Sequence, residues 1–212
     1  MAATVRSPGS TSRTKPQAVH RIGCPETASQ IGACGGSWTK QNPPERPVQG
    51  FQLVGIDPAP FVGLFDLTDA QLRARGAVRR IATESPGFPC RVSLEDAEVG
   101  EELLLLPYEH HATPSPYRGS GPIFVRRGAR QQRLPVGEIP SYVSRRLISV
   151  RAYDALGMMV DALVCEGGTV RDAIKRFFAD NQVAYLQLHN AKQGCFSCQV
   201  DRARRWPSYR SA

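Results

Sequence analysis

The sequence predicts an α+β fold, with a single domain on a mostly antiparallel sheet and two or three short helices. Three observations predict it. Between residues 50 and 201, segments with strand character outnumber segments with helical periodicity. The strands arrive mostly in consecutive pairs joined by short turns, which is typical of antiparallel sheets. A segment of this length also buries roughly 70% of its unfolded surface, which is enough for one independent domain.

The first half of this domain is expected to contain strands around one capped helix. A first strand is expected at 51–56, where apolar residues precede a proline-rich turn. Thr68 and Gln71 have the spacing of a capping box, which predicts a helix that begins after Thr68. Gly76 occupies the usual position just past the end of such a helix. The other strands of this half are expected at 77–83 and 103–106.

The second half is expected to contain paired strands and the strongest helix of the chain. Residues 147–153 and 158–164 have strand character and flank a turn that contains Gly157. Thr169 is expected to cap the helix, because four apolar residues recur at helical spacing after it. These four are Val170, Ile174, Phe177 and Phe178. A short strand is also expected at 123–126.

Residues 185–200 are interpreted as a β-hairpin with its turn between Asn190 and Gly194, since Asn and Gly tolerate positive φ. Folding the two arms symmetrically places His189 opposite Cys195. Alternation along the strands then gathers six apolar residues on one face. They are Ala184, Leu186, Leu188, Phe196, Cys198 and Val200. Cys198 is therefore expected in the core and Cys195 on the more polar face, so the two are not expected to form a redox pair.

The charge of the chain is concentrated at its two ends. The formal net charge is +8, with 27 basic and 19 acidic residues. Residues 1–49 hold six basic and two acidic residues, and residues 202–212 hold four basic residues and no acidic one. The segment 50–201 therefore carries 17 of each sign and is neutral. Since domains that bind phosphates usually show a basic excess, we expect no nucleic acid partner for this core.

The two ends are expected to lie outside the fold. Residues 1–49 are rich in Ser, Thr, Pro, Gly, Gln and Arg and lack periodicity, which predicts a disordered basic leader. Two other interpretations stay open: an organelle transit peptide, or a true start near Val48 with the leader as a gene-model artefact. Residues 202–212 are expected to form a basic disordered tail.

A cytoplasmic protein without a membrane partner is expected. No apolar run approaches the ~20 residues that cross a bilayer, and the N-terminus lacks the apolar stretch of a secretory signal. Six cysteines are too sparse for a disulfide scaffold, so they are expected to be reduced. Cys24 and Cys34 lack the close spacing of zinc ligands, and the neighbours His110 and His111 would point to opposite faces of a strand. We therefore expect no metal and no cofactor.

Six stretches of the sequence form a collinear pattern. The first begins with Pro89-Cys90-Arg91, and the last runs from His189-Asn190 to Gly194-Cys195. All six are 89–97, 107–110, 115–118, 121–126, 157–162 and 189–195. Together they resemble a bacterial family catalogued only as a domain of unknown function, number 1203 in its series. The resemblance covers about residues 51–201 and implies one cytoplasmic bacterial domain, which argues against a transit peptide. Because the family has no assigned activity, the resemblance implies no catalytic role for any residue.

The first hypothesis of function is an enzyme that acts on a small molecule. Cys195 would be its nucleophile or redox thiol, and His189 would be the base. Directly opposed side chains on a hairpin have Cβ atoms ~5 Å apart, and a neighbouring imidazole favours the reactive thiolate. Asn190 would orient the histidine, as in other Cys-His sites.

The second hypothesis is a non-catalytic binding domain for a small anionic ligand. A polar set would hold the ligand: Arg91, His110, Tyr117 and Arg118. A third interpretation is a structural or interaction domain with no site at the hairpin, because cysteine is usually a small buried hydrophobe. The sequence gives no indication of the oligomeric state.

Overall fold

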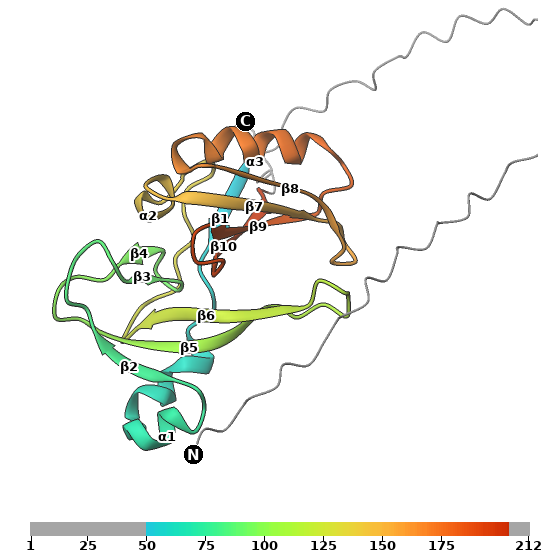
Figure 1. Ribbon diagram of the computed structural model, residues 1–212. Coiled ribbons are helices and arrows are strands. Elements are labelled where there is room, and N and C mark those ends of the chain that lie inside the picture. Colours follow the sequence, from blue (N-terminus) through green and yellow to red (C-terminus); the bar gives the residue numbers. More distant parts are fainter. Residues whose placement is uncertain (1–49, 204–212) are drawn as a thin grey trace, which may run out of the picture. The chain divides into compact units, whose positions relative to one another are not determined.

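Two five-stranded sheets form the framework of the protein (Figure 1). The computed structural model describes residues 50–203, so the predicted leader at 1–49 and the tail residues 204–212 lie outside the described part. All strand pairs but one are antiparallel in this part, and the helices are few and short. The predicted α+β fold is therefore confirmed. Within residues 50–203, no helix has both the length and the apolar character needed to cross a membrane.

The first sheet carries the longest helix on one face. Its strand order is β1-β10-β9-β7-β8. The strands are β1 (Phe51–Val54), β7 (Leu147–Tyr153), β8 (Met159–Glu166), β9 (Tyr185–Asn190) and β10 (Phe196–Arg202). The helix α3 (Val170–Ala179) packs over β7 and β8 (Figure 1). Because β10 runs to Arg202, the sheet extends one residue into the segment predicted as tail.

The helix at α3 is confirmed, but its predicted cap is not. Thr169 occupies the N-cap position, yet its side chain accepts no capping hydrogen bond. The Thr169 hydroxyl instead donates to the Glu166 carbonyl at 3.0 Å. A short 3₁₀ turn, η2 (Gly167–Thr169), precedes α3 and holds the hydroxyl in that position.

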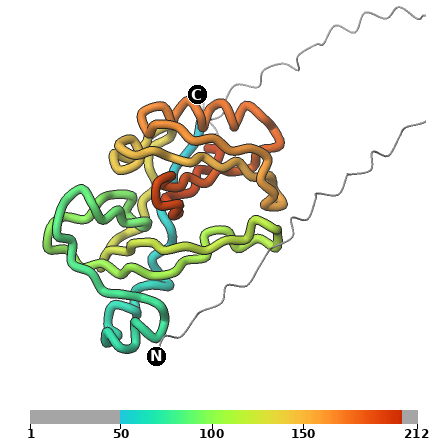
Figure 2. The backbone as a smooth tube through the Cα atoms, viewed as in Figure 1, coloured from blue at the N-terminus to red at the C-terminus, as the bar shows by residue number. Residues whose placement is uncertain are grey.

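The second sheet has the order β2-β5-β6-β3-β4. Its strands are β2 (Val78–Ile81), β3 (Pro89–Cys90), β4 (Glu95–Asp96), β5 (Glu102–His111) and β6 (Gly119–Arg126). The remaining helical elements are η1 (Ala59–Asp66), α1 (Asp69–Arg73) and α2 (Ser141–Ser144). Figure 2 shows the path of the chain, which leaves the first sheet after β1, builds the second sheet and then returns to the first.

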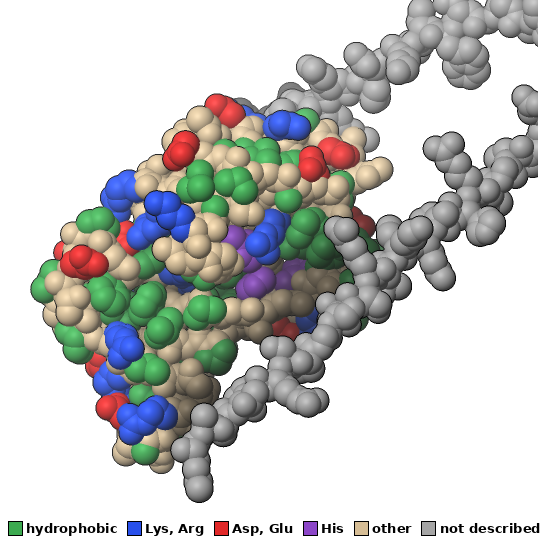
Figure 3. Space-filling model, viewed as in Figure 1, with side chains coloured by type: hydrophobic (Ala, Val, Ile, Leu, Met, Phe, Trp, Pro, Cys, Tyr) green, Lys and Arg blue, Asp and Glu red, His purple; other side chains and the backbone are tan. Residues whose placement is uncertain are grey.

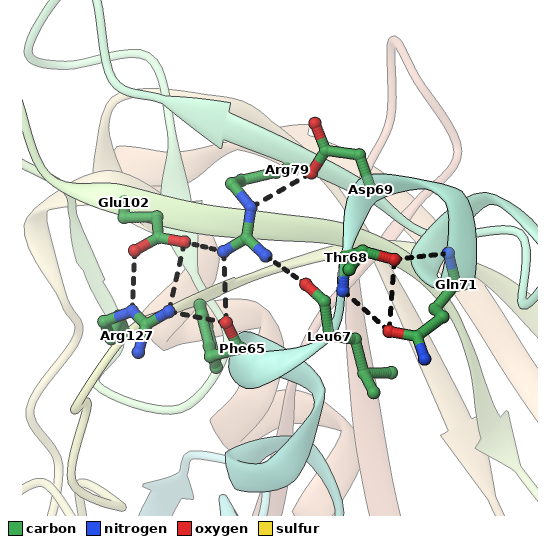
Figure 4. Close-up of polar contacts among 8 residues, drawn as sticks. All are labelled: Phe65, Leu67, Thr68, Asp69, Gln71, Arg79, Glu102 and Arg127. Carbon is green, nitrogen blue, oxygen red and sulfur yellow. Dashed lines mark hydrogen bonds and ion pairs between the residues drawn. The ribbon is translucent and has the colours of Figure 1, made fainter.

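The predicted capping box at α1 is confirmed. The Thr68 side chain accepts from the Gln71 backbone N–H at 3.3 Å, and the Gln71 side chain accepts from the Thr68 backbone N–H at 2.8 Å (Figure 4). These two bonds satisfy donors that the first turn of a helix leaves free.

Glu102 ties the second sheet to η1. Its carboxylate accepts from Arg79 and, at 2.6 Å, from Arg127 (Figure 4). Both guanidinium groups also donate to the Phe65 carbonyl, at the end of η1. The hydrogen bond from Arg127 is the main reason why the pKa of Glu102 lies below its ordinary value.

The buried residues form two main clusters. The first lies between α3 and the first sheet, and it includes Leu186, Leu188 and Cys198. The second contains Leu104 and Leu106 of β5 and Ile123 and Val125 of β6, and it also includes Phe196 from the first sheet. The aromatic ring of Phe196 therefore packs between the two sheets.

The β9–β10 hairpin is confirmed, but its predicted register is wrong. His189 lies opposite Phe196 rather than Cys195. A bulge between Phe196 and Cys198 then shifts the pairing again, so Cys198 lies opposite Leu188. The bulge inserts one extra residue, which breaks the strict alternation on which the prediction depended. The predicted apolar face is correct for Leu186, Leu188, Cys198 and Val200, but Phe196 faces the other sheet. The prediction that Cys198 lies in the core is confirmed, because it is 1% exposed.

Candidate functional site

The sulfur of Cys195 lies between two nitrogen donors. Arg91 Nη2 and Asn190 Nδ2 each donate to Cys195 Sγ at 3.4 Å. Cys195 sits in the hairpin turn, where its carbonyl accepts from the Asn190 backbone N–H at 2.9 Å. Arg91 directly follows β3 of the other sheet. We call these three residues the thiol cluster.

Arg91 is a buried cation, only 2% exposed. Its Nε donates to the Phe196 carbonyl at 2.8 Å, and its Nη1 donates to the Pro89 carbonyl. Among residues 50–203, no carboxylate forms an ion pair with Arg91. A buried charge without a counter-charge is costly, and positive groups beside a cysteine favour its thiolate. The Cys195 sulfur is the group in contact with Arg91 that can carry a negative charge.

A recess of about 270 Å³ adjoins the thiol cluster at Asn190. Its other lining residues are Arg145, Arg146, Leu147, Glu166, Lys192 and Gln193. Asn190 is 4% exposed, and its buried Oδ1 has no hydrogen-bond partner among residues 50–203. The lining contains three basic side chains and one acidic one. Arg145 and Arg146 form ion pairs with Asp96, so Lys192 is the basic side chain of the lining that has no ion pair among the described residues.

His189 makes its contacts away from the thiol. Its Nδ1 lies 3.2 Å from the Gly194 carbonyl, and its Nε2 lies 3.3 Å from Gln187 Oε1. Burial, followed by the charge of Arg151, lowers the pKa of His189 to about 3. The imidazole is therefore neutral at physiological pH. The expected contact between His189 and Cys195 is replaced by contacts of the thiol with Arg91 and Asn190.

A second polar group lies between the sheets, which we call the histidine cleft: His110, Ser149, Arg151, Gln187 and His189. His110 Nδ1 lies 3.1 Å from Gln187 Oε1, and Gln187 Nε2 donates to the His110 carbonyl at 2.7 Å. The rings of His110 and His189 meet edge to face at 4.9 Å. Figure 3 shows histidine side chains at the base of a hollow between the two layers, next to a basic side chain.

A family model described as "Protein of unknown function (DUF1203)" matches residues 87–202, which is more than half of the 212-residue chain. The chain belongs to this family. The predicted resemblance is thereby confirmed. No curated protein and no solved structure matches the chain.

Both polar groups of this DUF1203 domain fall inside the matched range. Arg91 marks its early part, and Asn190 and Cys195 lie close to its end. The match also contains all five residues of the histidine cleft. By contrast, β1, η1 and α1 precede the matched range.

The four residues predicted to hold an anion have separate partners in the DUF1203 domain. Arg91 belongs to the thiol cluster, and His110 belongs to the histidine cleft. Tyr117 packs edge to face on Tyr153, with ring centroids 6.4 Å apart. Arg118 is exposed and forms an ion pair with Glu109 at 2.5 Å. The contacts of Tyr117 and Arg118 thus lie outside both polar groups.

Sequence reasoning missed Gln187 and Arg151. Gln187 lies two residues before His189, so the alternation of the hairpin could have placed it beside the histidine. Arg151 joins the cleft because β7 pairs with β9, which puts Arg151 opposite Gln187. That pairing links segments far apart in the chain, and no local sequence pattern predicts it. Within the part of the chain that the structure describes, no three His, Cys, Asp or Glu side chains are grouped to hold a metal ion.

Proposed function

We propose that the protein is an enzyme that acts on a small polar molecule through the thiol of Cys195. The observation that carries this proposal is the contact between the buried Arg91 guanidinium and Cys195 Sγ, in a site where no carboxylate of the described chain balances the charge. A thiolate at Cys195 supplies that balance. Thiolates are the nucleophilic form of cysteine, so the same contact that neutralises Arg91 prepares the sulfur for attack.

Each residue of the thiol cluster has a role in this proposal. The Cys195 sulfur bonds to an electrophilic atom of the substrate, and the electron pair of the bond that breaks at that atom stays with the substrate atom or leaving group it is displaced onto. Arg91 stabilises the negative charge before attack. Asn190 donates to the sulfur through Nδ2 and also lines the recess beside the thiol cluster.

The proposal needs no contact between Cys195 and His189. Sequence reasoning assigned His189 as the base that removes the thiol proton. Arg91 donates to the sulfur directly, and positive neighbours of this kind are found beside reactive cysteines. His189 instead fixes the turn through the Gly194 carbonyl at 3.2 Å.

The test is alkylation of the native full-length chain by iodoacetamide, with the rate at each cysteine followed by peptide mass spectrometry. Cys195 is expected to react faster than Cys165, which is also partly exposed but whose pKa is raised by burial. Asn190→Leu removes one donor to the sulfur and is expected to slow Cys195 several-fold.

Gln193→Leu is the matched control, because Gln193 lines the same recess without donating to the sulfur. It is expected to leave the rate at Cys195 unchanged. The proposal is wrong if Cys195 reacts no faster than Cys165, or if the Asn190 and Gln193 substitutions have the same effect.

A further inference from the structure

Arg151 is a second arginine without a carboxylate partner, and it lies in the histidine cleft. It is half-buried, and its Nε donates to Ser149 Oγ at 3.4 Å. No Asp or Glu within residues 50–203 forms an ion pair with it. On the neighbouring strands, Gln187 and Ala162 lie opposite Arg151, and neither carries a charge. A guanidinium in such a setting has donors free for an anion.

The orientation of Gln187 fixes which nitrogen of His110 carries a proton. Gln187 Nε2 donates to the His110 carbonyl, so Oε1 faces the imidazole. Oε1 can only accept, and His110 Nδ1 must therefore hold the proton. In the neutral ring, Nε2 then has a free lone pair and is an acceptor. Burial and the charge of Arg151 both lower the pKa of His110, which keeps the ring in this neutral form.

We propose that the histidine cleft binds a small oxyanion that carries its own hydroxyl group, of the kind found in a singly charged phosphate. Arg151 binds the negative oxygens, and His110 Nε2 accepts a hydrogen bond from the hydroxyl. The cleft thus offers the ligand one group that only donates hydrogen bonds, the Arg151 guanidinium, and one acceptor, His110 Nε2. This site uses neither Cys195 nor Arg91, and it stands without the proposed thiol chemistry.

The small residue at Gly119 makes room for His110 in this arrangement. A Cβ atom at Gly119 would lie 3.3 Å from His110 Cε1 and 3.6 Å from His110 Nε2. A side chain there would press on the edge of the imidazole that bears the acceptor. Gly119 therefore lets β6 approach the ring without displacing it.

A comparison of dihydrogen phosphate with sulfate tests the Arg151 contact and the His110 contact separately. Both offer oxygens to Arg151, but only dihydrogen phosphate offers a hydroxyl to an unprotonated His110. Sulfate carries the larger charge at pH 6, so charge attraction alone favours sulfate. The proposal expects the reverse order, because a buried acceptor left facing an oxyanion without a hydroxyl is destabilising.

The experiment is a titration of the full-length protein at pH 6 and constant ionic strength, with the ring signals of the histidines followed by NMR. Inorganic phosphate is expected to shift the His110 signal and to bind more tightly than sulfate. Arg151→Gln is expected to weaken phosphate binding by about tenfold or more, since a hydrogen bond to a charged group is lost. Arg151→Lys keeps the charge and is expected to retain part of the affinity.

Arg171→Gln is the control, because Arg171 is an exposed arginine of α3. It is expected to bind phosphate like the wild type, and circular dichroism checks that all variants are folded. Sulfate binding as tightly as phosphate, equal phosphate affinity in Arg151→Gln and the wild type, or no shift of the His110 signal would each overturn the proposal.

Discussion

The thiol cluster and the histidine cleft lie on two sides of Phe196. The Phe196 carbonyl accepts from Arg91 Nε, and its ring stacks on His110 with centroids 5.3 Å apart. In the thiol cluster, Arg91 touches a sulfur that can become an anion. In the histidine cleft, Arg151 lies near imidazoles and helps to lower their pKa values. The same residue type thus donates to a sulfur in one place and disfavours protonation of two imidazoles in the other.

This difference shows that the net charge of the domain does not predict the charge environment of an individual site. Residues 50–201 carry equal numbers of basic and acidic residues. Most of the ion pairs of the domain lie elsewhere, as with Glu102 and its two arginines. Arg91 and Arg151 are left out of this pairing. Arg91 lies beside Cys195, and Arg151 lies near His110 and His189. Both arginines are therefore candidates for a role in binding or catalysis rather than in stability.

The largest expected difference between the two regions is in how much the arginine of each contributes to the free energy of unfolding. Arg91→Met leaves the Phe196 and Pro89 carbonyls without a buried donor, and we expect the free energy of unfolding to fall by about 2–5 kcal/mol. Arg151→Met removes a half-buried side chain with one long hydrogen bond, and we expect a loss below about 1 kcal/mol. Urea unfolding of both variants measures the contrast. Equal losses in the free energy of unfolding would show that the two arginines contribute equally to stability.

The hairpin also shows where sequence reasoning succeeds and where it stops. Alternation placed Leu186 and Cys198 in the core correctly, because those residues respond to a local period of two. The turn closes so that His189 lies opposite Phe196 rather than Cys195, and the bulge after Phe196 then shifts the pairing once more. Neither feature has a local signature in the sequence. The Arg91–Cys195 contact spans 104 positions along the chain, and only the approach of the two sheets creates it. Residue types could nominate Arg91 and Cys195 separately, but not as neighbours.

The next largest effect concerns pH and separates the histidines from the thiol. His189 has a pKa of about 3 in the folded protein, below its ordinary value of 6.5. The unfolded chain therefore binds a proton first, and the stability contributed by neutral His189 is lost as pH falls below 6.5. The free energy of unfolding should drop by up to about 1.4 kcal/mol for each pH unit.

His189→Gln is expected to flatten this dependence between about pH 7 and pH 5. In that range Glu101 and Glu102 contribute little, because their pKa values lie below 4.5. Urea unfolding at several pH values provides the measurement. An unchanged slope in the variant would mean that His189 titrates normally in the folded protein.

The smallest effect compares the two cysteines of the hairpin. Cys198→Ala leaves a void in the core, and we expect a loss of about 1 kcal/mol in the free energy of unfolding. Cys195→Ser keeps an acceptor for Arg91 and Asn190 but cannot carry the charge that offsets Arg91, and we expect a larger loss of about 2 kcal/mol. Thermal or urea unfolding distinguishes them. A loss for Cys195→Ser no larger than that for Cys198→Ala would indicate that this sulfur carries no charge beside Arg91.

The most direct measurement of the central claim is the ultraviolet absorbance of the thiolate. At neutral pH, the spectrum of the wild-type chain minus that of Cys195→Ser is expected to contain a thiolate band, since Arg91 and Asn190 both donate to this sulfur. The same difference for Cys165→Ser is expected to be flat, because burial raises the pKa of Cys165. A flat difference spectrum for Cys195→Ser as well would contradict the account, because Arg91 would then be buried beside a neutral thiol.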